Sequence, residues 1–215
     1  MKFKAVLLDM DGTLIDTAPG VIACAKDVFR MMGLELPPEE NFRRFIGPPL
    51  PECFRLTAGL DRETCLRAAE VYKKTFNKKY IELFRIYPGM REFLEGCRKR
   101  DILLGVATFK QPGPMNDTLR HFGIDSLFSC AVGQDPDSTR TKAQIIEMCA
   151  EELGIPCDRS ILMVGDSQYD FDGAEDAGVS FAAAAYGYGF AGRSDVPGLT
   201  AAENVGGLSR FVFDS

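Results

Sequence analysis

The sequence of 215 residues predicts an α/β protein, with a doubly wound parallel sheet as its core and a second, smaller, all-helical domain. Short apolar runs alternate with helical patterns over much of the chain, which favours parallel strands joined by right-handed crossovers. A stretch of about 70 residues after the first run shows only helical patterns, as a separate domain would. Acidic and polar residues follow several of the runs, and parallel sheets bind their ligands at that edge.

The core strands are expected at five apolar runs in chain order. These are 3–8 (FKAVLL), 102–107 (ILLGVA), 127–132 (LFSCAV), 160–164 (SILMV) and 179–184 (VSFAAA). Helical patterns lie between the later runs, near 113–121, 142–153 and 169–177. Strands that alternate with helices in this way indicate a parallel sheet.

The long insertion after the first strand has a different pattern. It is expected to form helices near 19–32, 39–45, 50–57 and 61–82, with "LELPPEE" and "GLDRE" as breaks and caps. We therefore predict a core domain of residues 1–15 and 87–215 and a helical domain of residues 16–86. "YPG" at 87–89 is the expected return hinge.

The composition limits the possible partners. A net charge of −6 argues against a nucleic-acid backbone as ligand, although local cations leave room for a small anionic substrate. No apolar run is long enough for a signal peptide or a membrane span, and the seven cysteines form no CxxC pair. We expect a cytoplasmic monomer or homodimer with reduced cysteines. The single histidine, His121, is expected near a helix C-terminus as a structural residue, which leaves acid–base chemistry to carboxylates or lysine.

Two acids follow the first strand in "KAVLLDMDGTLIDTAPG", residues 4–20. Asp9 and Asp11 are two positions apart, so in an extended segment their side chains project to the same side. Like charges that lie close raise each other's pKa unless a cation or a proton comes between them. Such a pair favours a functional site over two carboxylates that merely cap a helix or stabilise a turn.

Other polar residues end or follow the later strands. Thr108 ends the second strand, and Asp166 ends the fourth, with Asp170 four residues later, where the two could share a helix face. Lys142 begins the helix before that fourth strand. Four acids, one hydroxyl and one ammonium group are thus expected at one edge of the sheet, a set that suits Mg²⁺ together with a phosphate.

These residues resemble the motifs of the haloacid dehalogenase superfamily, and the resemblance covers nearly the whole chain. The DxDGT motif matches 9–13, the Ser or Thr motif matches Thr108, the lysine motif matches Lys142, and GDxxxD matches 165–170. The helical insertion matches the C1 cap of subfamily IA, which closes over the site. An acid at Asp11, which the hydrolytic dehalogenases lack, points to phosphoryl transfer.

The resemblance implies a Mg²⁺-dependent phosphatase in which Asp9 forms an aspartyl-phosphate and Asp11 acts as general acid and base. It places Mg²⁺ on Asp9, the backbone carbonyl of Asp11, Asp166 and Asp170. Thr108 and Lys142 would hold the phosphoryl oxygens. The full set expected around the substrate is Gly12, Thr13, Thr108, Phe109, Lys110 and Lys142 from the core, and Arg43, Arg44 and Gly47 from the cap.

The substrate is left open by the sequence. "LIDTAPGV" and "RRFIGPPL" look like the phosphoglycolate phosphatase group, which is the first choice, whereas "GQDPDSTRTKAQ" and "YGYG" lean toward a 5′-nucleotidase-like branch. A phosphomutase similar to β-phosphoglucomutase is a further alternative, and a non-catalytic binding protein is least favoured. "GYGFAG" at 187–192 spells GxGxxG, but it follows the last predicted strand and opens no clear helix, so we expect a loop beside the site.

Overall fold

The computed structural model describes residues 3–46, 48–190 and 200–214, with the side chain of Arg43 left out. The chain divides into two compact units, one made of Met1–Ile15 and Ile86–Ser215 and the other of Asp16–Arg85. Two short strands, β2 (Ile15–Asp16) and β3 (Arg85–Ile86), pair where the chain passes between the units. In the described part of the chain, no helix is long and apolar enough to cross a bilayer.

The first unit is built on a parallel sheet. Its strands, in the spatial order β5-β4-β1-β6-β7-β8 within the described residues, are β5 (Cys130–Val132), β4 (Leu103–Ala107), β1 (Ala5–Leu8), β6 (Ile161–Gly165), β7 (Ser180–Ala184) and β8 (Ala201–Ala202). Every pairing between them is parallel. The predicted fold class and the five predicted strands are confirmed. The sequence analysis did not predict β8, because two alanines carry no strand pattern.

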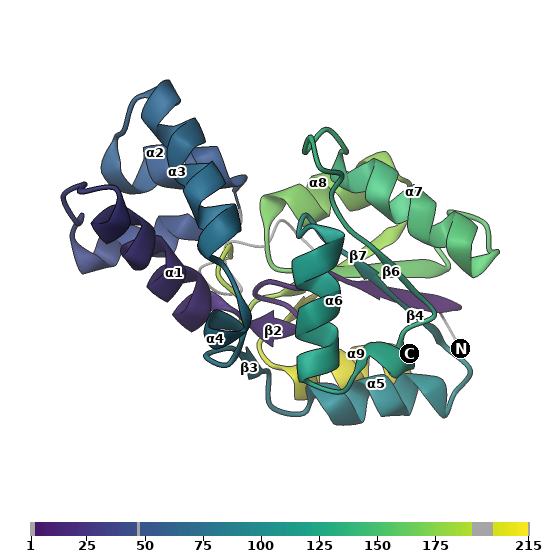
Figure 1. Ribbon diagram of the computed structural model, residues 1–215. Coiled ribbons are helices and arrows are strands. Elements are labelled where there is room, and N and C mark those ends of the chain that lie inside the picture. Colours follow the sequence, from purple (N-terminus) through teal and green to yellow (C-terminus); the bar gives the residue numbers. More distant parts are fainter. Residues whose placement is uncertain (1–2, 47, 191–199, 215) are drawn as a thin grey trace. The chain divides into compact units, whose positions relative to one another are not determined.

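Helices cover both faces of this sheet (Figure 1). They are α5 (Met90–Arg98), α6 (Pro112–His121), the short 3₁₀ helix η2 (Asp125–Leu127), α7 (Lys142–Leu153), α8 (Gln168–Asp176) and α9 (Val205–Phe213). α7 and α8 lie over one face and α5 and α9 along the other (Figure 1). The sequence analysis missed α5 and α9. Both are short and contain glycine, a poor helix former, so packing on the sheet decides their structure.

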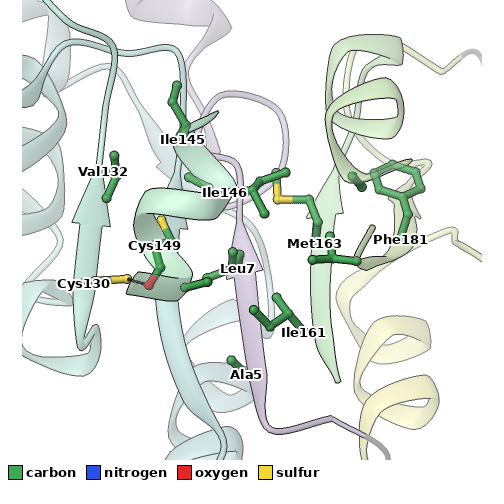
Figure 2. Close-up of a cluster of buried hydrophobic side chains, with 14 of the residues drawn as sticks. Ala5, Leu7, Cys130, Val132, Ile145, Ile146, Cys149, Ile161, Met163 and Phe181 are labelled. Carbon is green, nitrogen blue, oxygen red and sulfur yellow. Dashed lines mark hydrogen bonds between the residues drawn. The ribbon is translucent and has the colours of Figure 1, made fainter. Parts of the chain in front are cut away.

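The apolar core lies between the sheet and α7 (Figure 2). Leu7 and Met163 from the strands meet Ile146 and Cys149 from the helix, and all four are fully buried. Both faces of β1 are buried, so its sequence is continuously apolar instead of alternating. All seven cysteines are free, and only Cys157 is exposed.

The strand order places one strand end at the centre of the sheet. From β1 the chain builds outward through β4 to β5, and α7 then returns it to β6 on the other side of β1. The carboxyl ends of β4, β1 and β6 therefore lie side by side where the direction of winding reverses. This is where open α/β sheets bind their ligands.

The second unit is helical. It contains α1 (Ala18–Met31), the 3₁₀ helix η1 (Glu39–Phe45), α2 (Leu50–Ala58), α3 (Arg62–Thr75) and α4 (Lys78–Ile81). Its core is aromatic, with the Phe54 ring 4.8 Å from that of Phe45 and 5.6 Å from that of Phe29. The single helix predicted for 61–82 is two helices, because Asn77 starts a new one by accepting a hydrogen bond from the Lys79 amide at 3.0 Å.

Candidate active site

A buried lysine lies at the centre of the candidate site. Nζ of Lys142 donates to Oδ1 of Asp9 at 2.8 Å and to the carbonyl oxygen of Ala107 at 3.0 Å. It also lies 2.7 Å from Oδ1 of Asp170. Burial lowers the pKa of Lys142, but the carboxylates of Asp170 and Asp9 outweigh this effect and raise the pKa above its ordinary value. The ammonium group therefore stays charged and ties the two carboxylates together.

The N-terminus of α7 fixes the position of this lysine. Oγ1 of Thr141 accepts from the Gln144 amide at 3.2 Å, and Oε1 of Gln144 accepts from the Thr141 amide at 2.9 Å. This reciprocal capping box starts the helix at Lys142. The sequence analysis predicted a helix from 142, and the capping box gives the reason for that boundary.

Asp166 and Asp170 come together for a different reason from the one expected. Asp166 follows β6 but precedes α8, which begins at Gln168, so the two acids do not share a helix face. Instead, Ser167 caps α8, and its amide and hydroxyl group donate to Oδ2 of Asp170 at 3.1 and 2.7 Å. The expected convergence is present, but a turn at the strand end produces it.

Three buried carboxylates form a group that fits a metal ion. Oxygens of Asp9, Asp166 and Asp170 lie within 4.8 Å of one another. Burial, with Asp170 and Asp9 adding to it, raises the pKa of Asp166 to about 8, although two backbone amides act in the opposite direction. Burial also raises the pKa of Asp9, against the effect of Lys142. Carboxylates this costly to ionise without a counter-charge are suitable oxygen ligands for Mg²⁺. The carboxylate of Asp11 does not belong to this group.

Asp11 has its own cation. Nζ of Lys110 donates to both oxygens of Asp11, at 2.9 and 3.1 Å. Asp11 is more accessible than Asp9, with 23% of its side chain exposed against 10%. Oγ1 of the buried Thr108 accepts from the Lys110 amide at 3.2 Å, so the hydroxyl group helps to hold the turn after β4.

The remaining core residues of the predicted site lie around these groups. Gly12 has a φ of +86°, and a Cβ there would lie 2.2 Å from Oδ2 of Asp166, so only glycine fits. Thr13 is buried, and its hydroxyl group makes no hydrogen bond to the described residues. The Phe109 ring lies 4.8 Å from Nζ of Lys142.

Three of the predicted site residues belong to the helical unit. Arg44 is exposed on η1. The side chain of Arg43 and residue Gly47 lie outside the described residues. Their roles stay predictions.

Sequence reasoning expected a loop beside the site at 187–192, but it did not foresee that this loop holds Asp166. Its Oδ2 accepts from the backbone amides of Tyr188 at 2.6 Å and Gly189 at 3.2 Å. Both belong to the "GYGFAG" stretch, whose last two residues lie outside the described part of the chain. The closely spaced glycines were the available signal, because they permit close approach of the backbone.

Comparison with known proteins defines the class. A family model described as "Haloacid dehalogenase-like hydrolase" matches residues 6–184, and the chain belongs to this family. It is similar to a 5′-nucleotidase of Pseudomonas aeruginosa, with 32% identity over 88% of this chain and 86% of that protein. A phosphoglycolate phosphatase of Rhodobacter capsulatus is 31% identical over 86% of this chain and 85% of that protein.

A solved structure agrees with this family assignment. The crystal structure of a predicted phosphatase from Clostridium acetobutylicum superposes with a TM-score of 0.88 at 26% identity, covering 99% of both chains. Within the haloacid dehalogenase superfamily, the protein is a phosphatase of subfamily IA.

Proposed function

We propose that this protein is a Mg²⁺-dependent phosphatase that hydrolyses a small phosphomonoester through an aspartyl-phosphate on Asp9. The observation that carries the proposal is the contrast between two acids after one strand. Asp9 is buried and bonded to Lys142, whereas Asp11 is more exposed and bonded to Lys110. Two carboxylates in such different environments are suited to two different roles.

In the first half-reaction, a carboxylate oxygen of Asp9 attacks phosphorus, and the bond between phosphorus and the leaving oxygen breaks. Asp11 donates a proton to that oxygen. In the second half-reaction, Asp11 takes a proton from water, and the water oxygen attacks phosphorus, which releases inorganic phosphate and restores the Asp9 carboxylate. Lys142 and Thr108 would hold the phosphoryl oxygens, and the Lys110 ammonium would orient Asp11.

The metal site would consist of Asp9, Asp166, Asp170 and the backbone carbonyl of Asp11. When bound, Mg²⁺ would neutralise the carboxylates and the charge of the phosphoryl group. The charge balance supports this assignment. With Asp11 deprotonated, four carboxylates face two lysine ammonium groups, which leaves two negative charges for a divalent cation to balance.

We propose candidate substrates from the proteins to which this chain is similar. Phosphoglycolate is the first candidate, and a nucleoside 5′-monophosphate is the second, favoured by the 32% identity to the Pseudomonas aeruginosa 5′-nucleotidase. We further propose that residues 16–85 form a cap that selects the substrate, with Arg43, Arg44 and Gly47 taking part. We also propose that the protein is cytoplasmic and that its partner is a small molecule, not a nucleic acid or a membrane.

A phosphate-release screen tests the function directly. The purified protein would be assayed with p-nitrophenyl phosphate, phosphoglycolate, nucleoside 5′-monophosphates and sugar phosphates, with Mg²⁺ or with excess chelator. We expect Mg²⁺-dependent release from one class of ester. Full activity in chelator would contradict the metal assignment. Interconversion of sugar phosphates without net phosphate release would instead identify a phosphomutase.

A further inference from the structure

We propose that the segment Tyr186–Gly189, which follows β7, is a positioning element that holds Asp166 and the loop 9–13 in their working arrangement. The segment itself is not proposed to contact the substrate. Its effect is to position Asp166 and the loop 9–13. One of its three tests rests on the proposed metal site, one rests on turnover, and one does not depend on either.

The first link is a pair of backbone amides. Tyr188 and Gly189 donate to the same oxygen, Oδ2 of Asp166, at 2.6 and 3.2 Å. These bonds offset part of the cost of burying that carboxylate and restrict its rotation. Among the described residues, Oδ1 of Asp166 receives no hydrogen bond, so it is the oxygen left for a cation.

The second link is a phenol. The hydroxyl group of Tyr186 donates to the carbonyl oxygen of Thr13 at 3.0 Å, inside the loop that carries both acids of the first motif. The ring of Tyr186 packs edge-on against that of Tyr87, with centroids 4.8 Å apart. The Gly187 amide donates to the carbonyl oxygen of Ala184 at 2.9 Å, which ties the segment to the end of β7.

The third observation is how closely the segment approaches its targets. A Cβ on Gly187 would lie 2.3 Å from Cβ of Asp166 and 2.4 Å from the carbonyl oxygen of Gly12. A Cβ on Gly189 would lie 2.5 Å from the carbonyl oxygen of Asp166. No side chain fits at either position without displacing the residues of the site. The glycines of "YGYG" are therefore explained by contact with the site itself.

Amide exchange tests the first link in the metal-free protein. Asp166→Ala removes the acceptor, so NMR should show faster exchange of the Tyr188 and Gly189 amides, by about 10-fold or more. The Gly187 amide, which is bonded to Ala184, is the internal control and should change little. Unchanged exchange at Tyr188 and Gly189, or equal acceleration at all three amides, would overturn the proposal.

Mg²⁺ affinity tests whether the hold of this segment on Asp166 supports metal binding. Calorimetric titration should show that Gly189→Ala weakens Mg²⁺ binding by about 10- to 100-fold, the usual effect of disturbing groups that orient a ligand, with kcat recovering at saturating Mg²⁺. Gly113→Ala is the matched control, because a Cβ there meets nothing within 4 Å. Unchanged affinity in a folded Gly189→Ala protein would overturn the proposal. A parent protein that binds no Mg²⁺ would instead refute the proposed metal site, and amide exchange would then decide this inference alone.

Tyr186→Phe tests the second link, because it removes only the donor to Thr13. We expect kcat to fall by about 3- to 10-fold, the effect of one hydrogen bond, with KM nearly unchanged. An unchanged kcat would remove the phenol from the positioning element.

Discussion

Asp9 and Asp11 are separated by one residue, yet their cations come from different elements. Lys142, at the start of α7, pairs with Asp9, and Lys110, after β4, pairs with Asp11. The proposed nucleophile, Asp9, is thus held in a buried ion pair, and the proposed acid–base residue, Asp11, keeps the accessibility that proton exchange with substrate and water would require.

Substitution of the two acids separates their proposed roles. Asp9→Asn should abolish turnover, because an amide cannot supply the attacking oxygen anion. Asp11→Asn should lose general acid–base help, worth about 10²–10⁴-fold, and the loss should be greater for alkyl than for p-nitrophenyl esters. Rapid-quench mass spectrometry with an aryl phosphate should then show an adduct of about 80 Da on Asp11→Asn, since the acyl-phosphate forms but is hydrolysed slowly. An adduct on Asp9→Asn would mean that the nucleophile is wrongly assigned.

At the scale of elements, the capping of α7 connects helix stability with the site. The capping box starts the helix at Lys142, so the helix N-terminus and the lysine ammonium are placed together. β5 and the loop after it bring this N-terminus to the carboxyl edge of the sheet. A local hydrogen-bond motif therefore determines where a buried cation lies.

Thr141→Ala should show this connection. Loss of the cap should lower the free energy of unfolding by about 1 kcal/mol, measured by urea denaturation. It should also lower kcat/KM, because Lys142 is less firmly placed. Asn204→Ala is the matched control, since Asn204 caps α9 by accepting from the Gly207 amide at 2.9 Å. We expect the control to lose similar stability and to keep kcat/KM. Equal kinetic losses in both variants would contradict the proposed link.

The helical unit contains a pH-sensitive contact of its own. Asp27 of α1 accepts from the Tyr80 hydroxyl group at 2.8 Å and from Lys79 at 3.2 Å. The Tyr80 hydrogen bond is the main cause of the lowered pKa of Asp27. Burial, the second-largest effect, raises the pKa, and hydrogen bonds from Lys79 and Arg30 lower it further. A lowered folded-state pKa means that the carboxylate stabilises the folded protein above the unfolded-state pKa, and that this contribution disappears as the pH falls through the folded-state pKa.

Asp27→Asn should therefore destabilise the protein at neutral pH, by about 1 kcal/mol or less for a partly exposed group. The difference from the parent in urea denaturation should shrink as the pH falls below the unfolded-state pKa of about 3.9. Tyr80→Phe, which removes the largest contributor, should reproduce part of the effect. A constant difference at every pH would show that the charge of Asp27 does not contribute.

For the whole molecule, the ionised acid cluster opposes folding unless a proton or a cation neutralises it. Three carboxylates converge with little access to water, and Lys142 balances only part of their charge. A ligand that binds only the folded state stabilises it by mass action. Stability should thus depend on the metal as well as on the apolar core.

Thermal unfolding in chelator and in Mg²⁺ measures this dependence. At about 100 times its Kd, Mg²⁺ should stabilise the parent by about 2.7 kcal/mol, or roughly 5–10 °C in Tm. Asp166→Asn keeps an oxygen for the two backbone donors and removes the charge. We expect it to be at least as stable as the parent in chelator and to show little response to Mg²⁺. A full Mg²⁺ response in this variant would place the metal elsewhere.

The sequence by itself determined five strands of the sheet and the class of enzyme, and it placed at strand ends the acids Asp9, Asp166 and Asp170 that the structure brings together. Strands buried on both faces leave continuous apolar runs, and a parallel sheet gathers whatever follows them at one edge. The motif residues could therefore be identified without knowing the order of the strands. The start of α7 was also predictable, because its capping box is local.

Only the tertiary structure decided which groups pair. Lys142 and Asp9 are 133 residues apart, and the Tyr188 amide is 22 residues from Asp166. Such contacts depend on strand order and on where α7 and the segment after β7 pass, which no local pattern encodes. The same holds for α5, α9 and β8, whose weak local preferences are overcome by packing on the sheet. The local sequence specifies which residue types follow the strands. Contacts between distant segments create the environment that gives each acid its proposed role.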